Sequence, residues 1–213
     1  MGSFGLHPHT RPRPPVPLAL PPEIREVATI LAALRAPWAI AGGWALDLAI
    51  GRVTRPHADV DVAVFRADQE AVRGALPGWR FEVARAGALA PWAVGERLAL
   101  PVHEVHAWPP PGEPGRRLEF LLNEREGGDW VYRRDPAVRL SLASAIRVGV
   151  GGIRTLAPEI VLLYKSKAPR AQDEHDFRAA APSLDAEARA WLRAALRRAK
   201  PEHPWAAALT PES

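Results

Sequence analysis

The sequence predicts a mixed α/β fold whose C-terminal part is helical. Up to about residue 156, short apolar and β-branched runs alternate with segments that have helical spacing. After Pro158 the apolar residues follow helical spacing only. A length of 213 residues is enough for one domain with a helical extension. We therefore expect a disordered proline-rich tail over 1–21, a core with a mixed central sheet flanked by helices over 22–156, and a helical segment packed on it over 157–213.

Proline dominates the beginning of the chain. Residues 1–22 contain seven prolines, and proline has no backbone N–H to donate to a helix or a ladder. Because proline is tolerated in the first helical turn, Pro22 is a suitable start for the first helix. Apolar residues at 3–4 spacing carry that helix to about Pro37.

The remaining helices and strands are predicted from apolar or β-branched runs, from the spacing of apolar residues and from Gly and Pro at turns. Gly42-Gly43 is expected to form a turn, Gly51 to close a helix, and the prolines of 109–114 to lie in a hairpin connection. Expected strands are 38–41, 60–65, 79–83, 92–100, 102–108, 117–122, 129–133, 146–150 and 153–155, and expected helices are 44–50, 69–76, 158–167, 172–181 and 184–199.

Composition excludes several classes of function. The chain has no cysteine, which excludes disulfides, thiolate catalysis and cysteine-ligated metals and fits a reducing compartment. The longest uncharged stretch, Ala36 to Leu46, is too short to span a bilayer. No apolar block of signal-peptide type occurs near the start. The net charge is +4 without a block of basic residues, so a DNA-binding module is not indicated. We expect a cytoplasmic protein with no membrane partner.

One short segment carries the chemistry. Gly42-Gly43 ends an apolar strand and is followed at once by a helix. Glycine lets a phosphate approach the backbone, and a helix N-terminus offers free N–H groups and partial positive charge. This arrangement predicts a phosphate cradle.

Two acidic residues follow at the head of the next strand. Asp59 and Asp61 are two residues apart, and the strand period places both carboxylates on one face. Like charges repel there unless a cation lies between them, and oxygen ligands suit a hard divalent cation. Arg55 and His57 directly precede the pair and can meet phosphate oxygens.

These residues carry a resemblance to a known family. The string GGWA-x-D lies at Gly42–Asp47, and GR-x-TR-x-H-x-D-x-D lies at Gly51–Asp61. Gly-Gly followed by Asp-x-Asp resembles the nucleotidyltransferase superfamily with the polymerase-β-like fold. The longer run, Trp38 to Phe65, looks like the aminoglycoside 2″-adenylyltransferase branch. Weaker similarity to related bacterial proteins extends to 118–124 and 162–176.

The resemblance implies a reaction and its parts. A hydroxyl of a small-molecule acceptor, such as an aminoglycoside-like antibiotic, attacks the α-phosphorus of a nucleoside triphosphate, with AMP from ATP as the expected group. Two Mg²⁺ ions would be bound by Asp59, Asp61 and a third carboxylate on a neighbouring strand. We assign Glu119 to that role because a carboxylate inside an apolar strand needs a reason. Glu104 and Glu124 remain rivals, and the family's usual residue is Asp.

The same resemblance assigns the nucleotide-binding residues. Gly42, Gly43 and Trp44 would form the phosphate cradle, with Trp44 where many superfamily members have serine. Arg55 and His57 would contact phosphate oxygens or hold the loop, and Lys165 would reach the β- and γ-phosphates.

Two other functions stay open. A toxin-like nucleotidyltransferase would modify tRNA or protein, and a catalytically silent protein of this fold would act as a binding or antitoxin partner. An absent third carboxylate would favour the silent protein.

Four further positions carry expectations of their own. Asp47 is expected to hold the loop rather than to catalyse. Asp173, Glu174 and Asp176 suggest a solvated helix face, or else one of them orients Lys165 or binds a cationic acceptor. His103 and His106 are three apart on an expected strand, so they should face opposite sides and not share a metal. These readings depend on contacts that a sequence does not contain.

Overall fold

The computed structural model describes residues 19–85 and 87–210, so most of the expected disordered tail lies outside the described residues. The strands are β1 Trp38–Ile40, β2 Asp61–Phe65, β3 Arg80–Arg85, β4 Ala88–Pro91, β5 Glu104–Trp108, β6 Leu118–Glu126, β7 Asp129–Val131, β8 Arg139–Ser141, β9 Ile146–Val148 and β10 Arg154–Leu156. The helices are α1 Pro22–Ile30, α2 Gly42–Ile50, α3 Gln69–Ala75, α4 Leu142–Ala145, α5 Pro158–Lys165, α6 Ala171–Ala180, α7 Ala186–Ala199 and α8 Pro204–Ala208.

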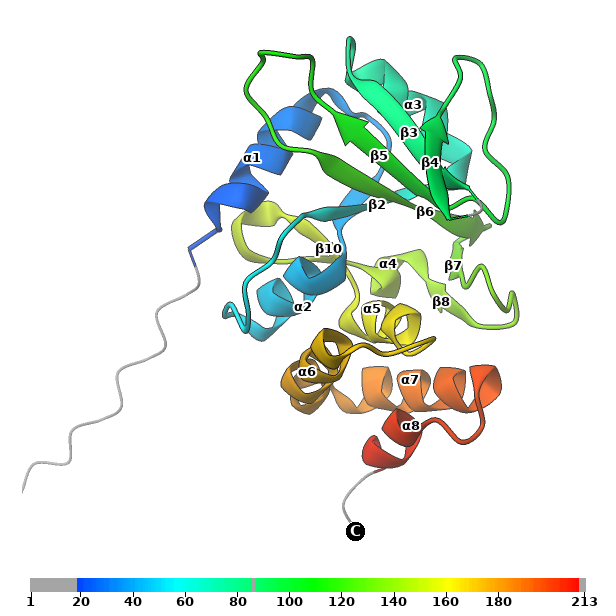
Figure 1. Ribbon diagram of the computed structural model, residues 1–213. Coiled ribbons are helices and arrows are strands. Elements are labelled where there is room, and N and C mark those ends of the chain that lie inside the picture. Colours follow the sequence, from blue (N-terminus) through cyan, green and yellow to red (C-terminus); the bar gives the residue numbers. More distant parts are fainter. Residues whose placement is uncertain (1–18, 86, 211–213) are drawn as a thin grey trace, which may run out of the picture.

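A mixed sheet forms the centre of the molecule (Figure 1). Its strand order is β4-β3-β5-β6-β2-β1-β10-β9, and β7 and β8 branch from the far half of β6. The pairs β2–β6 and β1–β10 are parallel, and the other neighbours along this order are antiparallel. The expected α/β fold with a mixed central sheet is confirmed.

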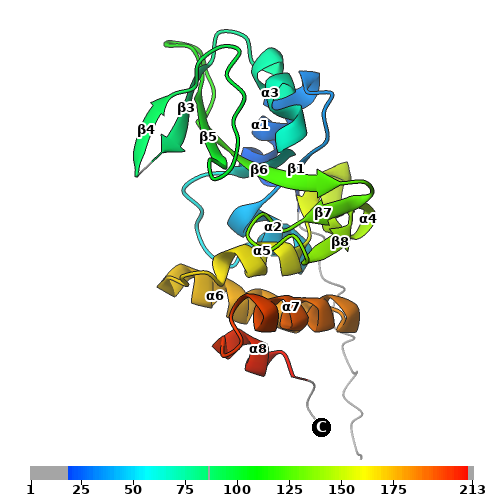
Figure 2. The same cartoon turned by 90° about the vertical axis from the view of Figure 1, so that its right-hand side faces the viewer.

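The helices lie in two groups. Figure 2 shows α5, α6, α7 and α8 stacked below α2, while α1 and α3 lie toward the opposite end of the molecule. One continuous cluster of buried apolar side chains joins the two groups, with Phe120 from the sheet, Leu46 from α2 and Leu162 from α5 all fully buried. Helices α5 and α6 both contact α2.

Gly42 and Gly43 do not form a separate turn. They are the first residues of α2, and Gly42 has a φ of +58°. The expected separate turn is thus wrong. The chain changes direction at Gly42, which has the left-handed conformation, and α2 begins at that same residue. Gly51, with a φ of +82°, closes α2 as expected.

The expected strand over 92–100 is wrong. The backbone N–H of Trp92 still donates to Phe81 of β3. Farther along, side chains take the place of a neighbouring strand: Gln69 bonds both the N–H and the carbonyl of Leu98, and Arg73 donates to the carbonyl of Trp92. The edge strand is instead β4, just before this segment. Sequence patterns also missed β8, α4 and α8.

The proline-rich connection does join a hairpin, since β5 and β6 pair antiparallel. The expected strand 146–150 is present as the shorter β9, and the expected strand 153–155 as β10. The two strands pair antiparallel, with Gly151 and Gly152 in the connection between them. Within the part of the chain that the structure describes, no helix is long and apolar enough to cross a bilayer.

Candidate active site

Strand register brings the acidic residues together. Asp61 on β2 lies beside Glu119 on the parallel strand β6, and Glu119 lies opposite His106 on β5. Glu104 is two residues before His106, so its side chain leaves the same face of the sheet. Three adjacent strands therefore present three carboxylates and an imidazole on one face.

Gly42 packs directly against Asp61. A Cβ built on Gly42 would lie 1.8 Å from Asp61 Oδ2, and one built on Gly43 would lie within 3 Å of the His57 ring and the Arg55 guanidinium. The Ala41 residue that caps α2 offers no side-chain hydrogen bond to the first turn. The first N–H groups of α2 thus remain available for an anion next to the Asp61 carboxylate.

A cavity of about 330 Å³ opens over this face. Of the residues that sequence analysis selected, Gly42, Asp61, Glu119 and Lys165 line it, together with Glu104. His103 and Asp173, for which sequence analysis expected other roles, also line it. Sequence reasoning missed other lining residues, among them Asn123, Arg133, Arg134, Tyr164, Lys167 and Arg170.

The carboxylates on the sheet raise one another's proton affinity. Burial, followed by repulsion from Asp59, raises the pKa of Asp61 to about 6, although Lys165 acts in the opposite direction. Burial and the charges of Asp61 and Glu104 raise the pKa of Glu119 to about 7. The charges of Asp59 and Glu104 thus act on both Asp61 and Glu119, and a cation would relieve this repulsion.

Asp59 is placed differently from the expectation. The strand begins at Asp61, so Asp59 lies in the preceding bend, with a side chain that is 42% exposed. Its carboxylate pairs with Arg117 at 3.5 Å, and it does not line the cavity. Strand alternation therefore does not orient it, although its charge still reaches Asp61.

Asp47 holds the loop between α2 and β2. Its buried carboxylate accepts hydrogen bonds from the Thr54 backbone N–H at 3.1 Å and from Thr54 Oγ1 at 2.6 Å, and pairs with His57 Nε2 at 2.6 Å. The His57 ring also packs on Trp44, with 4.6 Å between ring centroids. His57 and Trp44 thus brace the loop from behind the cavity, which agrees with the structural role expected for Asp47.

The two basic residues of the sequence prediction are both held by α6. Arg55 makes a bidentate pair with Asp176 at 2.7 and 2.9 Å. Lys165 Nζ contacts Asp173 Oδ1 at 2.9 Å and Asp176 Oδ2 at 3.0 Å. Asp173 and Asp176 are buried, so the expected solvated face is wrong for them, and the alternative, in which this cluster orients Lys165, is what the contacts show.

Geometry separates the three candidates for the third carboxylate. Glu119 is the direct register partner of Asp61, and Glu104 lies one strand farther away. Glu124 is five residues beyond Glu119 on β6, where it pairs with Arg66 and does not line the cavity.

Basic residues also line the cavity. Lys165 and Arg170 contribute from α5 and from the start of α6, and Arg133 and Arg134 follow β7, with the Arg133 guanidinium 4.6 Å from the centre of the Tyr164 ring. No spacing rule links 133–134 to the glycine and aspartate motifs, so only the fold reveals them. The sequence did indicate that Asp173 and Asp176 lie together, since residues i and i+3 share one face of a helix.

Comparison with known proteins agrees with the geometry. The sequence model of the aminoglycoside-2″-adenylyltransferase family matches residues 23–84. Among curated proteins none matches the chain significantly. Two structures of ANT(2″)-Ia are similar: one in complex with adenylyl-2″-tobramycin (19% identity, 83% of this chain and 96% of that chain, TM-score 0.54) and one determined in solution (21%, 83% and 90%, 0.55).

Lincomycin-bound LnuA, a lincosamide antibiotic adenylyltransferase, is also similar, with 16% identity over 76% of this chain and 96% of that chain and a TM-score of 0.52. The chain has the nucleotidyltransferase fold. It resembles the aminoglycoside adenylyltransferase branch over its first strands and helices, and the family match and the similar structures indicate a nucleotidyltransferase enzyme. On this nucleotidyltransferase fold, the matched segment contributes the glycines and both aspartates, while Glu119 and Lys165 come from outside it.

Proposed function

We propose that the protein is a Mg²⁺-dependent nucleotidyltransferase that transfers AMP from ATP to a hydroxyl of a small-molecule antibiotic of the aminoglycoside type. The observation that carries this proposal is the pair Asp61–Glu119, set side by side on the sheet next to the open N-terminus of α2. The family match over 23–84 supports the adenylyl group as the one transferred.

The residues present fit a divalent metal. Asp61 and Glu119 are neighbouring carboxylates with raised pKa values, and the Gly42 backbone leaves no room for a side chain beside Asp61. Carboxylate oxygens are the donors that Mg²⁺ prefers. In the proposal Asp59, Asp61 and Glu119 hold two Mg²⁺ ions with the triphosphate, and Asp59 needs to turn from Arg117 toward the cavity. Bound metal would screen the negative charge on the attacking and leaving oxygens.

The chain's own groups then position the substrates. The first N–H groups of α2, after Gly42, bind phosphate oxygens of the nucleotide. Lys165, fixed by Asp173 and Asp176, faces the β- and γ-phosphates. Because these groups are fixed before the substrate arrives, little reorganisation is needed at the moment of reaction.

Glu119 has the properties of the base. In the absence of bound metal, burial and the neighbouring carboxylates raise the pKa of Glu119 to about 7, near neutral pH, where a general base works well. In the proposed step Glu119 takes the proton of the acceptor hydroxyl, whose oxygen bonds to the α-phosphorus. The bond from that phosphorus to the bridging oxygen breaks, and pyrophosphate leaves with the electron pair.

The acceptor is proposed from the similar structures and the charge of the cavity. ANT(2″)-Ia is described with adenylyl-2″-tobramycin and LnuA with lincomycin, so antibiotics are the first acceptors to test. An aminoglycoside is polycationic, and Asp61, Glu104 and Glu119 give one wall of the cavity the opposite charge. The basic residues of the cavity would serve the triphosphate.

The test begins with the nucleotide. Calorimetric titration with non-hydrolysable ATP and GTP analogues, with and without Mg²⁺, should show metal-dependent binding of the ATP analogue to the wild type and its loss in Asp61→Asn. Glu113→Gln, in an exposed loop, is the matched control and should bind like the wild type. Mass spectrometry then follows the gain of one adenylyl group on aminoglycosides and lincosamides.

Two results would contradict the proposal. A folded protein that binds neither nucleotide would favour the silent-fold alternative. Nucleotide binding without modification of any antibiotic, but with labelling of tRNA or protein, would favour the toxin-like alternative.

A further inference from the structure

The face of the sheet carries a group that the proposed reaction does not use. His106, on β5, lies directly opposite Glu119 and only 9% of its surface is exposed. Its Nδ1 is buried and has no hydrogen-bond partner. A buried polar nitrogen without a partner is costly, so it points to a missing ligand.

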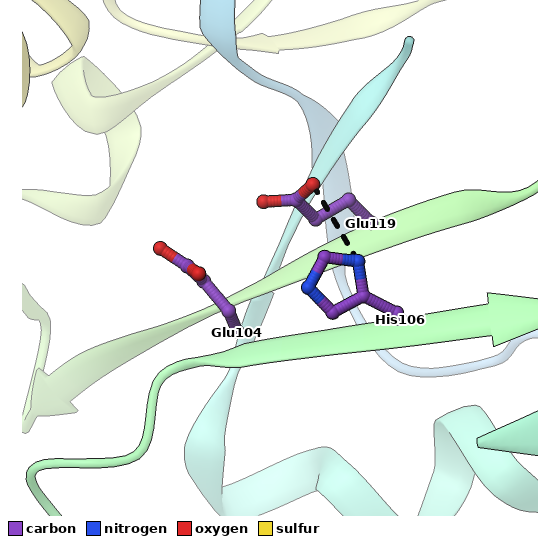
Figure 3. Close-up of side chains that lie close together, drawn as sticks. All are labelled: Glu104, His106 and Glu119. Carbon is purple, nitrogen blue, oxygen red and sulfur yellow. Dashed lines mark ion pairs between the residues drawn. The ribbon is translucent and has the colours of Figure 1, made fainter. Parts of the chain in front are cut away.

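His106 belongs to a cluster of potential metal ligands. His106 Nδ1 lies 3.7 Å from Glu119 Oε2, which is too far for a hydrogen bond. One potential ligand atom from each of Glu104, His106 and Glu119 lies within 4.8 Å of the other two. Figure 3 shows the three side chains beside one another, with a dashed line from a Glu119 carboxylate oxygen to a ring nitrogen of His106 and with Glu104 on the side of the other ring nitrogen. The gap between them is of the size that a single cation occupies.

Ligand type indicates which cation. Metal–ligand bonds to imidazole nitrogen and carboxylate oxygen are ~2.0–2.2 Å long, so two ligands of one ion lie at most about 4.4 Å apart. The observed cluster needs only small side-chain movements to reach that geometry. Mg²⁺ favours oxygen and water, whereas an imidazole donor favours Mn²⁺, Co²⁺ or Zn²⁺.

We propose that Glu104, His106 and Glu119 form a binding site for a divalent transition-metal ion. The site shares Glu119 with the proposed function but needs no nucleotide, so it can exist whether or not the transfer reaction does. His103, which contacts Glu104 at 3.3 Å, lies outside the cluster.

The test uses the full-length chain stripped of metal with a chelator and titrated with Mn²⁺ in the absence of nucleotide. Loss of the electron paramagnetic resonance signal of free Mn²⁺ measures binding, and pulsed measurement of nitrogen coupling reports an imidazole ligand. We expect one Mn²⁺ ion with nitrogen coupling that excess Mg²⁺ displaces poorly. His106→Gln should remove the coupling and weaken binding by about tenfold or more, since even indirect partners of a ligand change affinity by that factor.

Two variants serve as controls. His175→Gln removes an exposed imidazole whose ring contacts only the Thr54 carbonyl oxygen at 3.3 Å, and it should leave the coupling and the affinity unchanged. Glu104→Gln provides a second way to weaken the site, and circular dichroism confirms that each variant is folded.

Three outcomes would overturn the inference. The first is Mn²⁺ bound to the wild type without nitrogen coupling, which needs no variant to observe. The second is unchanged affinity in a folded His106→Gln or Glu104→Gln protein. The third is binding that Asp61→Asn abolishes and His106→Gln does not, which would assign the ion to the aspartate pair. Nucleotide binding, measured separately, decides the proposed function independently of these results.

Discussion

A single added carbon at Gly42 tests the site most directly. The new Cβ of Gly42→Ala would lie 1.8 Å from Asp61 Oδ2, in a residue with a φ of +58°. We expect metal-dependent nucleotide binding to fall below detection in calorimetry, because the Asp61 carboxylate must move away.

Gly51→Ala is the matched control for this change. Gly51 also has a positive φ, +82°, but a Cβ there would meet no atom within 4 Å. The left-handed conformation alone costs about 1–2 kcal/mol, so this variant should unfold earlier in denaturant and still bind nucleotide. Equal nucleotide binding by the two variants would contradict the proposed cradle.

A second prediction at this scale separates the rival carboxylates. Glu119→Gln should reduce the rate of adenylyl transfer by at least ~100-fold, the lower range of what a positioned base contributes. Glu124→Gln removes the partner of Arg66, so it should lower stability and leave the transfer rate of the folded protein unchanged. Steady-state rates with the antibiotic that proves to be the acceptor measure both effects. A full rate in Glu119→Gln would return the role to Glu104.

Residue identities in the site were predictable to different degrees. Gly42 and Asp61 were predicted from motif spacing and Lys165 from its place on an expected helix, and the structure places all three around one cavity. Arg133 and the orphan nitrogen of His106 could not be found, because they depend on strand register. The expected opposition of His103 and His106 assumed a shared strand, but His103 precedes β5.

Asp173, at the start of α6, allows the contribution of one helix end to the free energy of unfolding to be measured. Burial raises the pKa of Asp173, but hydrogen bonds from Arg170 and Lys165 outweigh it and bring the pKa to about 2, below the ordinary 3.8. A lowered pKa stabilises the folded state above about pH 4, and this contribution is lost as the pH falls from about 4 to 2.

Asp173→Asn should therefore be less stable than the wild type at pH 7, by on the order of 1–3 kcal/mol. The difference should shrink below pH 4, as urea denaturation at each pH will show. Arg170 is mostly exposed, so Arg170→Gln is a milder control. A difference between wild type and Asp173→Asn that stays constant from pH 7 to pH 2 would contradict this account.

Elements were predictable where local signals were strong. Helices after Pro158 and the strands around Val62 and Phe120 match because apolar periodicity and β-branched runs reflect real burial. The segment 92–100 failed because Gln69, far away in sequence, bonds Leu98 and replaces a neighbouring strand. Short elements such as β8 and α4 have too few residues to show a period.

At the scale of the whole molecule, one apolar cluster includes both the sheet and the C-terminal helices. We propose that the two segments on either side of the 156/157 boundary fold together as one cooperative unit. Chemical denaturation followed by tryptophan fluorescence and by circular dichroism should then give one coincident transition. A fragment ending at residue 156 should not fold, because it would expose the face of α2 that α5 and α6 cover. Two separated transitions would instead show independent units.

The pair between Arg55 and Asp176 joins positions 121 residues apart. Translation at ~5–20 residues per second leaves roughly 6–24 s between the appearance of the glycine–aspartate segment and that of its partner on α6. During this interval the ribosome-bound chain holds both aspartates and the glycines but neither α6 nor the clamp on Lys165. The proposed nucleotide site is therefore expected to stay incomplete in the nascent chain until α6 has emerged.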